Sequence, residues 1–194
     1  MSRALVLFAH PCEESFSQAL YETTCEALTG AGWEVDALDL YKDGFDPVMT
    51  ASERRAYHDQ DSNTAPVADY TVRLQAAEAL VMVFPVWNFG YPAILKGFID
   101  RVFLPGVSFV LQDGLLQPKL HNIKRLAAVT TYGGTRMRAL MCGDPPRKSV
   151  TRHIRAVLHP GARTRYMALY DMNRATEIER RNFRRLVAQQ LGRL

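Results

Sequence analysis

The residues best suited to chemistry stand in one short loop between two apolar stretches. The run Ala79 to Phe84 is typical of a strand buried on both faces of a parallel sheet. The loop that follows consists of Pro85, Val86, Trp87, Asn88, Phe89, Gly90 and Tyr91. In an open α/β sheet, such a strand-to-helix loop lies at the carboxyl edge, where ligands bind. Aromatic side chains beside an amide and a glycine suit a flat ring with polar atoms on its rim, although hydrophobic anchoring of the loop would use the same residues.

Two other segments hold candidate ligand contacts. In the segment from His10 to Ser17, the hydroxyls of Ser15 and Ser17 and the amides of a helix start could receive a phosphate. His10 could donate to that phosphate or stack on a base, whereas Glu13 and Glu14 would repel it unless they point outward. The second segment, in which a glycine pair lets the backbone approach a ligand closely, consists of Thr130, Thr131, Tyr132, Gly133 and Gly134. Capping or a simple turn explains each segment alone, but all three together favour a binding site.

Length, composition and charge limit the classes of protein to which this chain can belong. The chain has 194 residues, 47% hydrophobic and 23% charged, which predicts one globular domain over residues 1–194. No apolar run approaches the ~18 residues of a membrane span, and we read the start of the chain as a strand rather than a secretory signal, so we expect a cytoplasmic protein. The three cysteines lack metal-ligand spacing, so no metal site is expected. The net charge of +4 comes with a late arginine cluster that reads as a solvated helix face, and no nucleic-acid partner is expected.

The chain alternates between strand patterns and helix patterns. Strands are predicted at 4–9, 33–40, 79–84, 125–131 and 163–170, and helices at 16–30, 52–57, 67–78, 92–103, within 147–158 and at 175–192. Ser15 and Gln18 predict a capping box before the first helix. This alternation predicts a doubly wound parallel sheet of five strands. Because no glycine follows the first strand, the flavodoxin-like order 2-1-3-4-5 is favoured over the dinucleotide-binding order.

Several motifs in this order resemble the flavodoxin-like NAD(P)H:quinone oxidoreductases. The resemblance covers most of residues 4–134. It rests on His10-Pro11 with Ser15-Phe16-Ser17, on Asp39-Leu40-Tyr41 with Gly44 to Pro47, on Pro85, Trp87 and Phe89 followed by Pro92 to Phe103, and on Thr130 to Gly134. The pair Asn88-Phe89 is also similar to the flavin loop of azoreductases.

The resemblance implies a bound flavin, FAD ahead of FMN, with NAD(P)H as co-substrate and a quinone or similar acceptor. It places the phosphate end at His10, Ser15, Phe16 and Ser17, and the ring edge at residues 85–89 and 130–134. Tyr132 and Arg136 are the candidate catalytic residues: where mammalian members carry a Tyr and a His beyond the double glycine, this chain has arginines at 136 and 138. The implied mechanism is two-electron, ping-pong hydride transfer.

The implied assembly is a homodimer with the site at the subunit interface. The apolar surface predicted for helix 92–103 and for the loop from Leu104 to Leu116 agrees with it, and Gly97 inside that helix suggests close packing. Two alternatives stay open. One is a flavin-binding regulatory subunit in peripheral contact with a membrane potassium-efflux transporter, and the other is an azo or nitro reductase.

Overall fold

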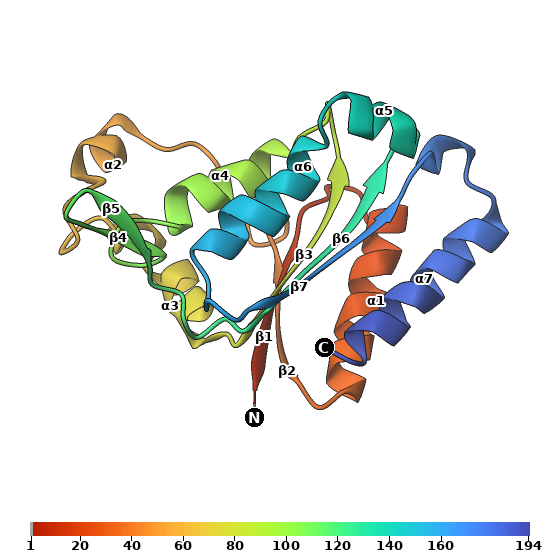
Figure 1. Cartoon of the computed structure of the whole chain (residues 1–194), viewed down its shortest axis with the longest axis horizontal. Helices are drawn as coiled ribbons and strands as arrows, with labels where there is room; N and C mark the ends of the chain where they lie inside the picture. Colours follow the sequence, from red (N-terminus) through yellow and green to blue (C-terminus); the bar gives the residue numbers. More distant parts are fainter. Residues whose placement is uncertain (1) are drawn as a thin grey trace.

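The computed structural model describes residues 2–194 and has a five-stranded parallel sheet at its centre. The strands are β1 (Arg3–Phe8), β2 (Glu34–Asp39), β3 (Ala79–Val86), β6 (Arg125–Tyr132) and β7 (Arg163–Leu169). They lie in the order β2-β1-β3-β6-β7, and Figure 1 shows them crossing the molecule side by side. This confirms the predicted α/β fold class and the predicted flavodoxin-like strand order, with the two hairpin strands described below left out of the count.

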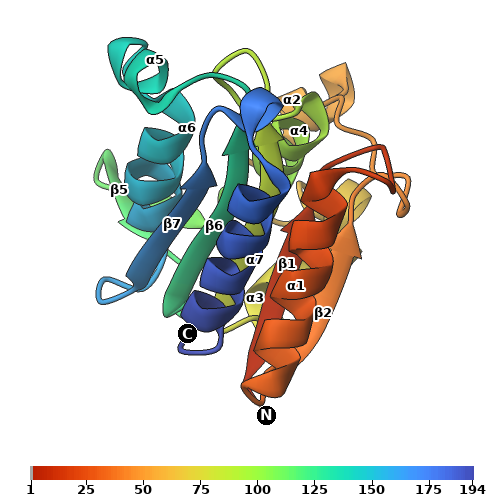
Figure 2. The same cartoon turned by 90° about the vertical axis from the view of Figure 1, so that its right-hand side faces the viewer.

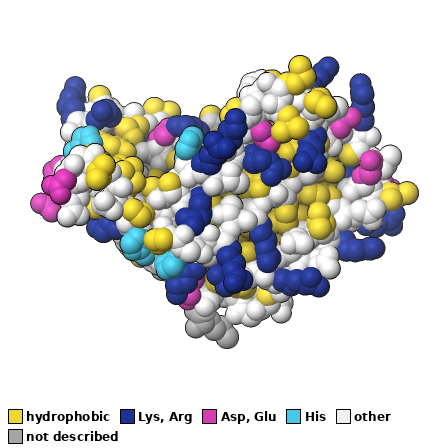
Figure 3. All heavy atoms as spheres, viewed as in Figure 1, with side chains coloured by type: hydrophobic (Ala, Val, Ile, Leu, Met, Phe, Trp, Pro, Cys, Tyr) yellow, Lys and Arg dark blue, Asp and Glu magenta, His cyan; other side chains and the backbone are white. Residues whose placement is uncertain are grey.

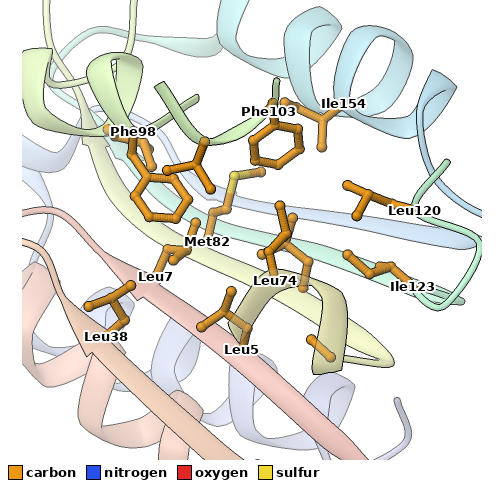
Figure 4. Close-up of a cluster of buried hydrophobic side chains, with 14 of the residues drawn as sticks. Leu5, Leu7, Leu38, Leu74, Met82, Phe98, Phe103, Leu120, Ile123 and Ile154 are labelled. Atoms are coloured by element: carbon orange, nitrogen blue, oxygen red, sulfur yellow. The ribbon is translucent and has the colours of Figure 1, made fainter. Parts of the chain in front are cut away.

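Helices cover both faces of the sheet. Figure 2 shows one face covered by α1 (Phe16–Gly30) and α7 (Glu177–Leu191). The other face is covered by α3 (Ala68–Ala76), α4 (Ala93–Val102) and α6 (Pro145–Lys148), which continues into the π-helical segment η2 (Ser149–Ile154). Successive strand side chains point to opposite faces, so β1 contributes Leu5 and Leu7 to one core and Val6 and Phe8 to the other. Figure 4 shows the first core, where strand side chains meet Leu74, Phe98 and Ile154 from the helices.

Short elements complete the chain. They are α2 (Ala51–Ala56), η1 (Ala65–Val67), an antiparallel hairpin of β4 (Phe109–Gln112) and β5 (Leu115–Pro118), α5 (Arg136–Met141) and η3 (Met172–Arg174). The hairpin was predicted as a loop, although Asp113 and Gly114, both at positive φ, are a strong two-residue hairpin turn. Helix α5 was not predicted, because Met137, Leu140 and Met141 are exposed and leave no core-facing period to recognise.

Two local predictions need correction. The Ser15 hydroxyl accepts the Gln18 backbone N–H at 3.1 Å, but the Gln18 side chain donates to Glu22 at 3.0 Å, so only half of the predicted capping box forms. Pro92 caps α4 from outside the helix instead of occupying its first turn. Both helices nevertheless start within one residue of the predicted place.

The segment after β2 is fastened to α4. A Cβ on Gly97 would overlap the backbone of Pro47, so Gly97 permits a close crossing within this chain. Arg101 of α4 pairs with Glu53 at 2.5 Å and also donates to the Asp46 carbonyl, and both charged side chains are about nine-tenths buried. The close packing that we expected at Gly97 is therefore explained inside one chain and gives no support to a subunit contact.

Replacing Gly97 by Ala should destabilise the fold by about 3 kcal/mol, because α4 and the Pro47 segment would have to separate. The matched control is Gly30→Ala, where a Cβ meets nothing within 4 Å and the change should stay within about 0.5 kcal/mol. Urea unfolding of both variants measures this difference. Equal stability of the two variants would contradict the packing described here.

Candidate functional site

A pocket of about 350 Å³ opens where β1, β3 and β6 end. It is lined by His10, Ser15, Phe16, Ser17, Pro85, Val86, Trp87, Thr131, Gly133, Met172 and Asn173. All three predicted segments therefore contribute to one pocket. Met172 and Asn173 were missed by sequence reasoning, although they follow β7 at the same edge and that position was the available signal. A larger hollow of about 660 Å³ lies between α2, α4, the hairpin and η2, away from these segments.

One end of the pocket is built from hydrogen-bond donors. Ser15 caps α1, and its hydroxyl takes the N–H of Gln18. The N–H groups of Phe16 and Ser17 lie in the first turn of α1 and have no carbonyl acceptor within the helix, so they are free to bind a ligand oxygen. Ser17 is 5% exposed and its side chain lines the pocket. A helix start with these donors attracts an anion.

His10 adds a hydrogen-bond donor to the pocket, because a backbone contact selects the tautomer of its imidazole ring. Its Nδ1 accepts the backbone N–H of Cys12 at 3.0 Å. A neutral imidazole that accepts at Nδ1 carries its proton on Nε2, so the other side of the ring donates. The ring lies edge-on to Trp87, with 5.8 Å between the ring centroids. His10 thus connects the donor end of the pocket to its aromatic end.

The two acidic residues of the first segment point outward. Glu13 pairs with Lys42 at 2.8 Å, and this hydrogen bond and the charge of Lys42 hold the pKa of Glu13 below its usual value. Glu13 lines a smaller neighbouring pocket with Asp39 and Lys42, which borders the first pocket at His10, and Glu14 is exposed. Every residue that lines the 350 Å³ pocket in the described chain is neutral or a histidine, so the objection that carboxylates would repel an anion is removed.

The aromatic end is a strained turn. Trp87 and Gly90 exchange two backbone hydrogen bonds of 2.8 and 3.3 Å, and the residues between them, Asn88 and Phe89, both have positive φ, at 49° and 55°. This is a type I′ turn, which usually holds Asn-Gly. Phe89 in that position costs about 1–2 kcal/mol. The turn leaves Trp87 and Phe89 about 40% exposed. Trp87 lines the pocket, whereas Asn88 and Phe89 lie outside its lining. Such backbone strain commonly marks a functional loop.

The opposite rim is the end of β6. Thr131 and Gly133 line the pocket, and a Cβ on Gly133 would approach Asn173 Nδ2 to 3.3 Å. Since the φ of Gly133 is not positive, the backbone does not require a glycine, and an added Cβ would be opposed only by the Asn173 side chain, which would have to shift by a few tenths of an ångström. Thr130 is fully buried beneath the rim, and its hydroxyl has no partner among the described residues. A Cβ on Gly134 would make ordinary van der Waals contact with Arg138 at 3.9 Å, and Gly134 lies outside the lining of the pocket.

Tyr132 turns away from the pocket. It is 2% exposed, and its hydroxyl donates to Asp144 at 2.6 Å and lies 2.7 Å from the Tyr166 hydroxyl. Burial, and then the bond to Asp144, raise the pKa of Tyr132 far above its ordinary value. Arg136 lines a different hollow beside β7. Neither candidate catalytic side chain therefore shares the pocket with His10 and Trp87, and what β6 offers there is Thr131, Gly133 and their backbone.

Comparisons with known proteins agree with this geometry. A family model described as a flavodoxin-like fold matches residues 2–180. NAD(P)H dehydrogenase (quinone) 1 of Cavia porcellus is 32% identical over 158 residues, which are 72% of this chain and 57% of that protein. The chain thus spans little more than half the length of this curated relative.

Two solved structures cover nearly the whole chain. Smu.1420 from Streptococcus mutans superposes with a TM-score of 0.86 at 26% identity, over 99% of this chain and 100% of that one. The FMN-dependent NADH-azoreductase of Bacillus anthracis, solved in complex with FMN, gives a TM-score of 0.80 at 17% identity, over 100% and 99% of the two chains. At this identity the azoreductase supports the fold alone.

The Tyr132 network yields a stability prediction. Tyr132→Phe leaves Asp144 Oδ1 and the Tyr166 hydroxyl without their hydrogen-bond partner, while Arg147 still pairs with Oδ2, so it should cost about 1–3 kcal/mol at pH 7. The pKa of Tyr132 is higher in the folded state than in the unfolded state. The contribution of its hydroxyl to the free energy of unfolding is therefore complete below pH ~10 and is lost as the pH rises above that value. Chemical unfolding between pH 7 and 11 should therefore show a flatter alkaline decline in the variant. An identical slope in both proteins would contradict this role.

Proposed function

We propose, on the premise that this chain belongs to the family of flavodoxin-like folds, that it is a flavin-dependent NAD(P)H:quinone oxidoreductase. One observation carries the proposal. A single pocket has an anion-binding helix start at one end, and at the other end an aromatic side chain faces the exposed backbone after β6. A flavin nucleotide has a phosphate at one end and a flat ring with polar edges at the other. The name of the Cavia porcellus relative supports a quinone as acceptor.

The residues present fit a flavin. We assign the phosphate to His10 Nε2, the Ser17 hydroxyl and the N–H groups of Phe16 and Ser17, since this end holds donors and lacks carboxylates within the described chain. The space in front of Gly133, which a Cβ would narrow, is assigned to the ring edge. Thr131 and the turn at Asn88-Phe89 would supply the remaining edge contacts. Sequence reasoning placed FAD ahead of FMN, and mass analysis of the released cofactor decides between them.

The protein's share in the chemistry is to bind, orient and exclude water. A bound flavin supplies the hydride chemistry itself, accepting two electrons from NAD(P)H and passing them to the acceptor. Backbone N–H groups at 133–134 are proposed to stabilise negative charge at the ring edge, because the side chains of Tyr132 and Arg136, the two candidate catalytic residues, lie outside the pocket. Trp87, which lines the pocket, and the exposed Phe89 in the same turn would form the wall against which donor and acceptor stack in turn.

Reduction of azo or nitro compounds is a second candidate, since the azoreductase from Bacillus anthracis shares the fold over the full chain. The same pocket would serve both reactions, so they differ in the acceptor alone. No helix among residues 2–194 is long and apolar enough to cross a membrane. Cytoplasmic location stays a prediction, as does the alternative of a regulatory subunit on a membrane transporter.

A homodimer is proposed from the hairpin. Leu111, Leu115 and Leu116 on β4 and β5 are 49–65% exposed, next to the 660 Å³ hollow lined by Ile99, Phe109 and Val157. Apolar surface of this kind is typical of a subunit interface. A second copy covering it would remove these leucines from water.

The glycine at the rim tests flavin binding. Gly133→Ala should lower flavin occupancy by about tenfold or more, because the methyl group enters the pocket beside Asn173. Gly134→Ala is the matched control and should retain the flavin, since its methyl group would make only ordinary contact with Arg138 outside the pocket. Absorbance of the purified variants gives occupancy, and their melting temperatures without cofactor should agree within a few degrees. If both variants lose flavin equally, or neither does, the assignment of the ring edge fails.

Kinetics test the reaction. With one pocket for donor and acceptor, the two substrates must alternate, so double-reciprocal plots at several quinone concentrations should be parallel. Stopped-flow mixing with NADH or NADPH without oxygen should bleach the flavin band. Phe89→Ala should raise the KM for quinone, because it removes part of the aromatic wall. If neither nucleotide bleaches the flavin within minutes, the oxidoreductase proposal fails and the alternative of a regulatory subunit replaces it.

The dimer is tested by light scattering at micromolar concentration. The wild type should have twice the mass of one chain, and Leu115→Asp should shift it toward the monomer, because a charge would enter the apolar contact. Ile178→Asp on α7, which is 61% exposed and distant from the hairpin, is the control and should stay dimeric. A monomeric wild type would overturn the proposal.

A further inference from the structure

The free edge of the sheet forms the floor of a groove that the proposed function does not use. Strand β7 is last in the sheet order and pairs with β6 on one side. A hollow of about 510 Å³ runs along its other side and touches Arg165, Tyr166, Met167, Ala168 and Tyr170. Successive strand residues point to opposite faces, so a hollow that touches all of them follows the strand edge itself. Such an edge presents N–H and C=O groups without a partner strand.

The walls of this groove, which we call the β7 groove, combine apolar and cationic side chains. Phe183 and Leu186 of α7 form one wall, and Leu186 is 43% exposed. Arg136 of α5 and Arg147 of α6 form the other. Figure 3 shows the result on the surface: a yellow hydrophobic patch between the positions of β7 and α7, with dark blue Lys and Arg side chains around it.

Positive charge stands at both ends of the β7 groove. At one end Arg165 donates to the Gln190 carbonyl and, at 2.9 Å, to the Arg193 carbonyl, which leaves it without a carboxylate partner among the described residues. At the other end Arg147 binds Asp144 at 3.0 Å and Tyr170 at 3.0 Å, and Asp144 is buried beneath it at 4% exposure. Arg136 at that end makes no ion pair within residues 2–194. No acidic side chain lines the groove in the described chain.

We propose that the β7 groove binds an extended segment of another protein that adds to the sheet as a further strand. The free backbone of β7 would supply the main-chain hydrogen bonds, and the walls would select the side chains. From Arg165 to Tyr170 the strand rises ~17 Å. The partner segment is therefore about six residues long, with apolar residues in the middle facing Phe183, Leu186 and Met167, and with Asp or Glu near both ends.

Charge excludes a second copy of this chain as the occupant. Edge-to-edge pairing of two β7 strands would bring Arg136 and Arg165 of both copies together, and the described groove offers no carboxylate to pair these two arginines. A flat anionic membrane would reach the rim arginines but not the backbone on the floor. An extended acidic segment is the occupant that satisfies both the backbone and the arginines.

The test is fluorescence anisotropy of a labelled peptide, acetyl-Glu-Leu-Thr-Val-Leu-Glu-amide, added to the purified chain. Micromolar binding that weakens with salt is expected. Arg136→Glu and Leu186→Glu should each weaken it by about tenfold or more. Arg181→Glu should bind like the wild type, because Arg181 lies about 160° around α7 from Phe183 and outside the groove. Circular dichroism and the flavin content of Leu186→Glu should match those of the wild type, so that a loss of binding reflects the groove.

Two altered peptides and one vesicle complete the test. Replacing the central Val by Pro removes a main-chain donor and should abolish binding, and replacing both Glu residues by Lys should do the same. Equal binding of the Pro peptide would show that charge alone acts and would overturn strand addition. Absence of binding at millimolar peptide would overturn the proposal outright. Capture by phosphatidylglycerol vesicles, lost in Leu186→Glu while the peptide fails to bind, would replace it by a membrane contact.

Discussion

The parallel pairing of β3 with β1 and β6 is the constraint on which the candidate site depends. The register sets Phe8 beside Val83 and Pro85 beside Thr131, so that three segments far apart in sequence leave the sheet at one level. Ala9 continues the ladder by donating to the Val83 carbonyl at 3.1 Å, which brings His10 to the same edge as Pro85. A shift of one residue in β3 would move its outward side chains to the other face and separate His10 from Trp87.

Packing on both faces holds this register. The two cores bury strand residues on alternate sides, so slippage would expose one set of apolar side chains and force the other against its neighbours. The contacts of Gly97 with Pro47 and of Arg101 with Glu53 then fix α4, the helix that follows the aromatic turn. The strained backbone at Asn88 and Phe89 is maintained between two rigid elements, β3 and α4, and such support is what a strained functional turn needs.

Sequence patterns were sufficient for the sheet and insufficient for the direction of individual side chains. The apolar runs and the residues at their ends predicted the strand order and most of the pocket lining, because position along a strand determines which edge a residue reaches. Tyr132 shows the limit: the next position along β6 from Thr131 points to the opposite face, where Asp144 binds its hydroxyl. Asp144 lies twelve residues further along the chain in an irregular segment, so no local sequence pattern predicts its contact with Tyr132.

Met172 and Asn173 were missed for a related reason. They belong to the connection after β7, which contains no glycine and whose one aromatic residue, Tyr170, was predicted as part of the strand. Both residues lie in η3, and from there they line the pocket. The exposed helix α5 and the apolar hairpin likewise bury little within one chain. Sequence periodicity reports burial inside the chain, so surfaces of this kind escape it.

The central claim is that one pocket at the ends of β1, β3 and β6 holds a flavin against Trp87. The chain has two tryptophans, Trp33 and Trp87, so a Trp33→Phe variant leaves Trp87 as a single fluorescent probe. Titrating the cofactor-free variant with FMN and with FAD, while following tryptophan emission and flavin emission together, tests the claim directly. The account predicts saturable quenching of both signals with the same midpoint, and the loss of both in Gly133→Ala. Flavin that binds without changing Trp87 emission, or no binding of either flavin, would contradict it.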